Sequence, residues 1–361
     1  MITVAEDQTE DWTAFGVYRV APDVYRIPMP LPGESRLRAV NVYAVQHDSG
    51  IVLIDSGWAM QGARDRLASA LAALGAGLGD VRRFLVTHQH RDHYTLAVEV
   101  RRVFNTPISV GIGEKPGLTL AMTPGRRQLE AQADALRRHG ADLLADAVLA
   151  GRAGVDTSRD WELPDEWIQP PQQVAVGGRT LRAVPTPGHT RGHVVFVDAD
   201  RQLLFAGDHV LPHITPSIGF EPVAFDHPLR DYLASLRLVR DLPDARLLPA
   251  HGPVRERAHP RIDELLAHHV RRLDTTATLV ETGAHTAYEV ALGLRWTRRE
   301  RPLAELDTFN QMLAVLETAA HLDVLVGLGR VYASTNEAHV HYSTAAGDRD
   351  PHAAADRPAK R

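Results

Sequence analysis

The sequence predicts an α/β fold, and three observations support this prediction. Short apolar runs rich in β-branched and aromatic residues alternate with segments whose leucines and valines recur at helical spacing. The order strand, helix, strand occurs in two halves of the chain. Several apolar runs end at a histidine or an aspartate, as expected where strands carry loop residues to one edge of a sheet. At 361 residues the chain is long enough for two domains.

In the first half, alternating apolar and polar residues predict antiparallel strands at residues 17–20, 24–27 and 40–45. Leucines at helical spacing then predict a helix at about 61–75. The apolar run 84–86 predicts a further strand. A second helix is predicted just after the loop that follows this strand, because Leu96, Val100 and Val103 share one helical face.

The stretch 124–150 differs from the segments around it, because its leucines lie in a charged, alanine-rich background. This pattern predicts one or two helices inserted between the two halves. Such an insertion could cover an active site as a lid. It could equally be a surface excursion without a catalytic role, since long insertions cost little stability.

From about residue 258 the pattern changes again and predicts a second, smaller domain. An amphipathic segment after Pro260, a capping box at 286–289 and an apolar segment at 306–320 predict three helices. Apolar runs predict short strands at residues 324–327, 329–332 and 339–342. Three helices and a small β wing together predict a winged-helix-like accessory domain over residues 258–343.

Composition narrows the range of functions. The net charge of −5 is mild, and the start of the third helix has no Arg or Lys, so nucleic acid is not an expected partner. There is no cysteine, which excludes disulfides, thiolate ligands and a thiol nucleophile. No apolar stretch reaches membrane-spanning length and the N-terminus lacks signal-peptide features, so we expect no membrane partner and a cytoplasmic location. The polar segments 1–15 and 344–361 are expected to be flexible and disordered, respectively.

The most informative segment is the hexapeptide HQHRDH at residues 88–93, directly after the strand at 84–86. It places three imidazoles and one carboxylate in a single short loop. Such a density of nitrogen and oxygen donors suits a divalent transition metal ion. The absence of a G-x-S-x-G motif also disfavours a serine hydrolase.

The pattern H-x-H-x-D-H resembles the signature of the metallo-β-lactamase superfamily, a family of metal-dependent hydrolases and a few oxidoreductases. Three later segments resemble the family's other ligand positions, in the same order along the chain. His189 lies in TPGHTRGH, Asp208 ends the apolar run LLFAG, and His251 lies in PAHG. The resemblance covers roughly residues 15–255.

This resemblance implies an αββα sandwich, two packed sheets with helices outside, over residues 16–257. It also implies two divalent metal ions, Zn²⁺ in the first place, with Fe or Mn as alternatives because both accept the same donors. The ligands implied for the first ion are His88, His90 and His189. Those implied for the second are Asp92, His93 and His251, with Asp208 touching both ions.

Other residues gain roles by the same resemblance. Asp55 follows the apolar run 51–54, where the family has a buried aspartate that steadies the metal loop. Thr87 and His193 lie next to ligands in the sequence and are further candidates for supporting contacts. Asp92 or Asp208 would accept the proton during catalysis.

The function implied is that of a dinuclear metal-dependent hydrolase in which a metal-bound hydroxide attacks a carbonyl carbon. The ligand set resembles that of glyoxalase II, which favours a small-molecule thioester or ester, such as an acyl-CoA, a hydroxyacyl-glutathione or a lactone. A ribonuclease or phosphodiesterase of the same superfamily is the alternative, suggested by the winged-helix-like tail. A non-catalytic metal-binding sensor or scaffold is the alternative from another class. A homodimer is among the assemblies that the sequence leaves open.

Overall fold

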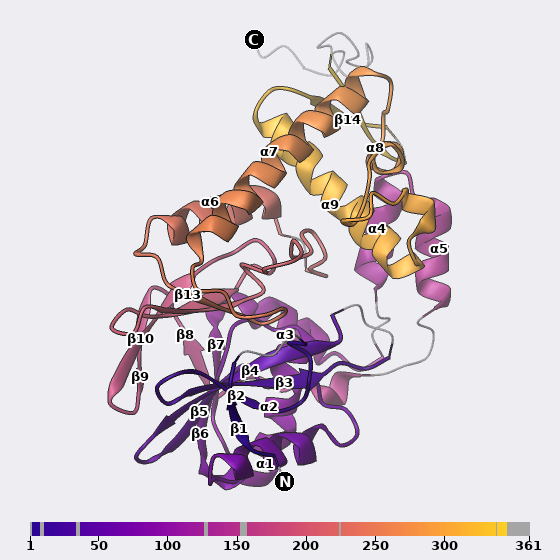
Figure 1. Ribbon diagram of the computed structural model, residues 1–361. Helices are drawn as coiled ribbons and strands as arrows, with labels where there is room; N and C mark the ends of the chain where they lie inside the picture. Colours follow the sequence, from indigo (N-terminus) through magenta and orange to yellow (C-terminus); the bar gives the residue numbers. More distant parts are fainter. Residues whose placement is uncertain are drawn as a thin grey trace, which may run out of the picture. The chain divides into compact units, whose positions relative to one another are not determined.

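The structure is a computed structural model that describes residues 2–7, 11–33, 37–125, 129–151, 157–223, 225–336 and 338–344. The chain forms two compact units (Figure 1). The first unit comprises Met1–Arg126, Val155–Ser217 and Val223–Leu266. The second comprises Arg127–Gly154, Ile218–Pro222 and Ala267–Arg361. Within the described residues, no helix combines the length and the apolar character needed to cross a membrane.

An eight-stranded sheet, with its strands in sequence order, forms one layer of the first unit. Strands β2 to β5 are antiparallel, and β5 to β8 run parallel to one another. The strands are β1 (Val4–Glu6), β2 (Val17–Ala21), β3 (Val24–Pro30), β4 (Ala39–His47), β5 (Gly50–Ile54), β6 (Val81–Val86), β7 (Ile108–Gly111) and β8 (Glu166–Ile168).

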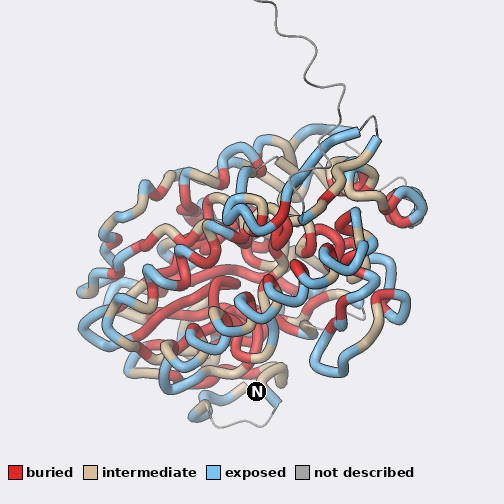
Figure 2. The backbone as a smooth tube through the Cα atoms, turned by 90° about the horizontal axis from the view of Figure 1, so that it is seen from above, coloured by how far each residue is buried: buried red, intermediate tan, exposed pale blue. Residues whose placement is uncertain are grey.

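A five-stranded sheet in the order β13-β12-β11-β10-β9 forms the second layer. Its strands are β9 (Gln172–Val176), β10 (Arg179–Pro185), β11 (Val194–Asp198), β12 (Leu203–Gly207) and β13 (Arg246–Pro249). The two sheets share one core, in which the Tyr43 ring meets the Phe205 ring edge-on, with 5.5 Å between their centroids. Buried residues follow the strands of both sheets (Figure 2).

Helices cover the outer faces of both sheets. Leu67 and Leu71 of α1 (Ala63–Ala73) and Val100 of α2 (Arg91–Phe104) share a core with the first sheet. Val239 of α6 (Pro228–Arg240) lines a small cavity together with Val197 and Leu204, which lie on the second sheet. The remaining short elements of this unit are α3 (Lys115–Ala121), η1 (Leu78–Asp80), η2 (Ile112–Glu114) and η3 (Ser158–Asp160). The predicted αββα sandwich is confirmed.

The N-terminal segment differs from the expectation that residues 1–15 are loosely attached. Strand β1 pairs in parallel with β2, beginning with Val4 opposite Val17. Asp7 then forms an ion pair of 2.5 Å with Arg26, whose side chain is only 1% exposed. A buried guanidinium needs a carboxylate partner, and this pair holds the start of the chain against the sheet.

The second unit is built largely from helices. These are α4 (Glu130–Arg138), α5 (Asp142–Ala150), α8 (Ala287–Gly293), α9 (Thr308–Gly327), the short η4 (Leu303–Glu305) and the larger part of α7 (His259–Glu281). The capping box predicted at 286–289 is present, because Thr286 Oγ1 accepts from the Glu289 amide while Glu289 Oε2 accepts from the Thr286 amide. The insertion predicted at 124–150 contains two helices, α4 and α5. Leu136 and Leu144 of these helices share a core with Val290 and Val315 of α8 and α9.

The predicted strand at 324–327 is wrong, because α9 continues to Gly327. Leu322 and Leu325 are fully buried in the apolar core of the unit, and helical spacing is what brings both of them there. An antiparallel pair follows, formed by β14 (Tyr332–Thr335) and β15 (Val340–Ser343). The wing therefore has two strands rather than three within the described residues, and the winged-helix-like topology stays a prediction. Residues 345–361, for which disorder was expected, lie outside the described residues.

Candidate metal centre

Seven side chains from separate segments of the first unit converge at one edge of the two sheets. The first four follow β6, in the loop and the first turn of α2, and the others follow β10, β12 and β13. All are buried or half-buried. They are His88, His90, Asp92, His93, His189, Asp208 and His251.

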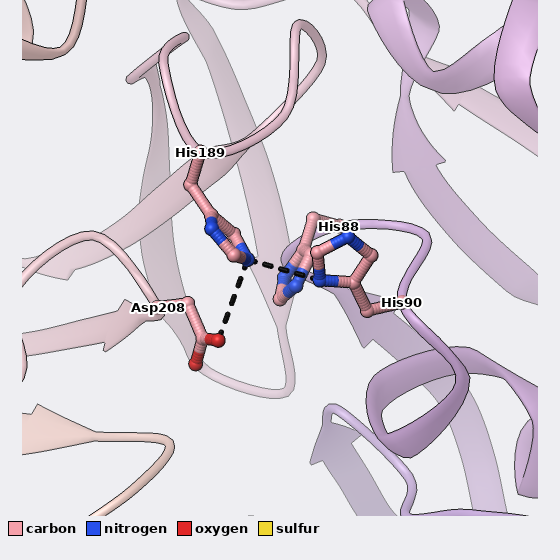
Figure 3. Close-up of side chains that lie close together, drawn as sticks. All are labelled: His88, His90, His189 and Asp208. Atoms are coloured by element: carbon pink, nitrogen blue, oxygen red, sulfur yellow. Dashed lines mark hydrogen bonds and ion pairs between the residues drawn. The ribbon is translucent and has the colours of Figure 1, made fainter. Parts of the chain in front are cut away.

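The first group consists of His88, His90, His189 and Asp208, whose candidate ligand atoms all lie within 4.8 Å of one another. His189 Nε2 lies 2.9 Å from His90 Nδ1 and 3.4 Å from Asp208 Oδ2. Figure 3 shows the three imidazoles and the carboxylate turned toward a common point. This is the set predicted for the first metal ion together with the predicted bridging residue.

The second group consists of Asp92, His93 and His251. His251 Nε2 lies 3.3 Å from Asp92 Oδ2, and His93 Nε2 lies 3.7 Å from the same oxygen. Asp208 Oδ1 lies 3.4 Å from His251 Nε2 and 3.6 Å from His93 Nε2. Because Asp208 Oδ2 faces the first group, the two oxygens of this carboxylate are divided between the groups.

These donors fit metal ions in geometry and in hydrogen bonding. Four ligands at about 2.1 Å from a tetrahedral ion lie roughly 3.4 Å from one another, which is close to the separations measured here. The buried atoms His88 Nε2, His93 Nε2, His251 Nε2 and Asp208 Oδ1 have no hydrogen-bond partner. Unpaired buried polar atoms are rare because they are costly. An ion at each group would satisfy them.

Hydrogen bonds on the far side of the rings set the tautomers of the candidate ligands. In three histidines, Nδ1 faces a carboxylate or a backbone carbonyl, and these groups only accept hydrogen bonds, so Nδ1 carries the hydrogen. A neutral ring then keeps its lone pair on Nε2, toward the site. The pairs are His93 with Asp55 Oδ2 at 2.9 Å, His189 with the Ser217 carbonyl at 2.7 Å, and His251 with the Ala39 carbonyl at 2.8 Å.

Asp55 and Thr87, predicted to support the metal loop, both contact candidate ligands. Asp55 Oδ1 accepts hydrogen bonds from the Thr87 amide at 2.8 Å and from Thr87 Oγ1 at 3.0 Å. Thr87 Oγ1 also lies 3.0 Å from His88 Nδ1. Since the hydroxyl hydrogen is donated to Asp55, His88 donates from Nδ1 and presents Nε2 to the site.

His193, the third predicted supporting residue, contacts the backbone of a ligand rather than its side chain. His193 Nε2 accepts from the Asp208 amide at 3.2 Å, and His193 Nδ1 lies 2.8 Å from Thr186 Oγ1. The preceding Gly207 has a φ of +50°. A Cβ there would lie 2.7 Å from both His193 Nε2 and Thr87 Oγ1. Only glycine therefore lets Asp208 approach the site along this path.

Burial controls the ionisation of the first group. It lowers the pKa of His90 to about 3 and the pKa of His189 to about 4, and it holds the pKa of His88 well below its usual range. Nearby histidines add to the effect. These rings are therefore neutral near pH 7, and the neutral form is the one that binds metal ions.

In the second group the pKa values of the histidines are raised rather than lowered. Burial alone would lower the pKa of His93, but Asp55, Asp92 and Asp208 outweigh it and raise this pKa to about 10. Asp208 and Asp92 likewise raise the pKa of His251. The negative charges of these carboxylates therefore favour positive charge at this point, and a divalent cation would supply it.

Arg91, within the same hexapeptide, was assigned no role from the sequence. Its guanidinium carbon lies 5.4 Å from the centre of the Trp58 ring and 5.6 Å from that of Trp161. It also forms a 2.5 Å ion pair with Asp160. The side chain therefore ties the start of α2 to η3. The carbonyls of Ser217 and Ala39 were also missed, because any residue supplies a carbonyl and no sequence signal marks it.

Known proteins resemble this chain both in sequence and in structure. Residues 35–251 match the family model described as the metallo-beta-lactamase superfamily. A solved structure of a metallo-beta-lactamase family protein from Thermus thermophilus is similar, with a TM-score of 0.73 and 28% identity. That likeness covers 91% of this chain and 100% of the other, so it extends beyond the segment matched by the family model.

Two curated relatives are similar over part of their length. The atrochrysone carboxyl ACP thioesterase of Aspergillus fumigatus is 27% identical over 70% of this chain and 63% of its own. The beta-lactamase-like protein 2 homolog of Caenorhabditis elegans is 36% identical over 28% of this chain and 31% of its own. The chain thus spans less than two thirds of either relative.

Proposed function

The chain belongs to the metallo-β-lactamase superfamily, and from this premise we propose that it is a dinuclear metal-dependent hydrolase of thioesters or esters. The observation that carries the proposal is the position of Asp208. One of its oxygens faces the first group of donors and the other faces the second. A carboxylate shared in this way is suited to two ions held close together.

Each group supplies enough donors to hold an ion and to leave a coordination position open. His88, His90 and His189 would hold the first ion, and Asp92, His93 and His251 would hold the second. All donors are nitrogen or oxygen, which suits Zn²⁺ and also suits Fe or Mn. When bound, such ions would polarise a substrate carbonyl and lower the pKa of a water molecule toward neutrality.

The side chains at this site would accept the proton of the attacking water and orient the metal ligands. Asp92 is the most exposed of the three acidic groups at the centre, with 15% of its side chain accessible against 9% for Asp208 and 3% for Asp55. Burial would raise its pKa, but His93 and His251 lower it below the usual range, so Asp92 is ionised near pH 7. We assign to Asp92 the acceptance of the proton that the attacking water releases. Asp55, Thr87 and His193 would keep the ligands oriented.

The thioester preference is supported by one relative of similar sequence. The relative named as an ACP thioesterase is 27% identical over 70% of this chain. Thioester hydrolysis needs a polarised carbonyl and an activated water, and the thiolate that leaves is a good leaving group that requires no dedicated acid. Acyl-CoA and hydroxyacyl-glutathione thioesters come first among the substrates, followed by lactones.

The test is thiol release from a panel of acyl-CoA and acyl-glutathione thioesters by protein reloaded with zinc or manganese. We expect release by the wild type and its loss in Asp92→Ala. Asp200→Ala, which removes a carboxylate from an exposed turn, is the matched control and should match the wild type. Undiminished turnover by metal-replete Asp92→Ala would exclude the assigned role of Asp92.

Two other outcomes would redirect the proposal. Hydrolysis of a phosphodiester, without release from any thioester or lactone, would make the protein a phosphodiesterase of the same superfamily. Stable binding of two ions without turnover of any substrate would favour a metal-binding sensor or scaffold.

A further inference from the structure

A second cluster of metal-binding side chains lies within the second unit, and none of its residues belongs to the centre described above. His268 and His269 lie on α7, and Glu317 lies on α9. One potential ligand atom from each of the three lies within 4.8 Å of the others. His321 of α9 is packed against them, since its ring is stacked on that of His269 with 5.2 Å between the centroids.

The two helices hold these side chains in a fixed arrangement. Glu317 and His321 are four residues apart, so they occupy the same face of α9. His269 and His321 are 0% and 1% exposed, whereas His268 and Glu317 are half-buried. The cluster is therefore anchored in the core of the unit through His269, while His268 and Glu317 keep part of their surface exposed to solvent.

A chain of hydrogen bonds determines which nitrogen of His269 carries its hydrogen. His321 Nδ1 lies 2.8 Å from the backbone carbonyl of Glu317, which only accepts, so His321 Nδ1 is the donor. The neutral His321 ring then accepts at Nε2, and His269 Nδ1, 3.1 Å away, is the donor to it. The lone pair of His269 is consequently on Nε2. This relay resembles the contacts that orient His93, His189 and His251 in the first unit.

The feature that a bound cation would offset is the burial of the Glu317 carboxylate, whereas Arg272 adds positive charge nearby. Burial raises the pKa of Glu317, and the positive charge of Arg272 only partly opposes the effect. Arg272 keeps its positive charge while its guanidinium lies 4.0 Å from the centre of the Trp296 ring and donates to the Arg295 carbonyl at 2.8 Å. A divalent ion bound to the Glu317 carboxylate would offset the cost of burying its negative charge.

We propose that His268, His269 and Glu317 bind a divalent transition metal ion of the zinc type, with His321 as a positioning residue for His269. Two imidazoles and one carboxylate are a donor set that proteins use for zinc, with water in the fourth position. The ion would join α7 to α9 and stabilise the second unit by binding its folded state. The inference is independent of the proposed hydrolase function.

The test is a count of zinc ions per chain in the full-length protein after equilibrium dialysis against zinc. We expect the double variant Glu317→Gln/His268→Asn to bind one zinc ion fewer per chain than the wild type. Glu281→Gln, the same isosteric change at an exposed position of α7, is the matched control and should bind as many ions as the wild type. Equal zinc content in the double variant and the wild type would overturn the proposal.

A second measurement covers the case in which the double variant folds poorly. Glu317→Gln alone preserves the shape of the side chain, and its melting temperature after complete metal removal is the reference for its own response to zinc. Adding zinc should then raise the melting temperature of the second unit in the wild type but not in Glu317→Gln. An equal rise in both proteins would also overturn the proposal.

Discussion

Asp55 accepts a hydrogen bond from His93 Nδ1 across 2.9 Å, and both side chains are almost fully buried, at 3% and 0% exposure. Asp55 adopts a φ of +60° at the end of β5, a conformation that non-glycine residues seldom adopt and that Asn tolerates best after Gly. Asp55→Asn should therefore keep the backbone and remove the charge together with one of the two acceptor oxygens that face Thr87 and His93. We expect the affinity for the second metal ion to fall by about 10- to 100-fold, measured by competition with a chromophoric chelator. An unchanged affinity would show that the charge of Asp55 does not reach the ion through His93.

Asp208→Ala should weaken both metal sites, because one carboxylate oxygen faces each group. Asp92→Ala should weaken only the second site, since the contacts of Asp92 are with His93 and His251. Metal analysis of the two variants over a range of zinc concentrations distinguishes these cases. Two variants with the same binding curve would contradict the division of Asp208 between the groups.

Arg91→Ala should destabilise the first unit without removing metal. The change deletes the contacts with Trp58 and Trp161 and the ion pair with Asp160. We expect a loss of about 1–2 kcal/mol in the free energy of unfolding, followed in urea by tryptophan fluorescence. Arg91→Lys keeps the charge but not the planar guanidinium, and should lie between the wild type and the alanine variant. A large loss of bound metal in Arg91→Ala, with the unit still folded, would mean that Arg91 acts on the ligands themselves.

The second unit should lose stability as the pH falls below neutrality. Burial, helped by Arg138, lowers the pKa of His139 to about 4. The unfolded chain, in which a histidine has a pKa near 6.5, therefore takes up the proton first. The contribution of His139 is complete above about pH 6.5 and is lost as the pH falls toward 4, with a slope of up to about 1.4 kcal/mol per pH unit.

Thermal or urea unfolding between pH 4 and pH 7 measures this slope. His139→Gln should make it shallower and leave the part that His269 and His321 contribute, since burial lowers the pKa of both. Arg138→Gln should flatten it in part, because removing the neighbouring charge raises the pKa of His139. A slope that is the same in all three proteins would assign the acid sensitivity of the unit to other groups.

The candidate ligands and the supporting side chains Asp55 and Thr87 could be predicted from the sequence, whereas the backbone contacts that orient other ligands could not. The seven candidate ligands were predicted from the resemblance of the hexapeptide and three later motifs to those of the metallo-β-lactamase superfamily, and the structure brings these seven together. The acceptors that orient His189 and His251 are backbone carbonyls of Ser217 and Ala39. Since every residue has a carbonyl, no residue type identifies them in advance.

In the second unit, tertiary packing decided the structure of a segment whose local sequence favours a strand. The run Val324–Gly327 favours a strand by its β-branched residues, yet α9 passes through it because Leu325 packs into the core. Adding residues to an existing helix is also easier than starting a new element. The apolar faces of α4 and α5 could be predicted from leucine spacing, but periodicity does not say which core they join.

The candidate ligands come from both sheets of the first unit, which bears on how this unit would acquire metal ions. In each group some donors follow β6 of the first sheet, and the others come from the edge of the second sheet. Neither sheet alone holds a complete site, so an ion can be retained only after the two layers have come together. Metal binding would therefore require an assembled sandwich, and bound ions would oppose separation of the two layers. In a folding experiment, tight metal uptake should follow formation of the core between the sheets and should not precede it.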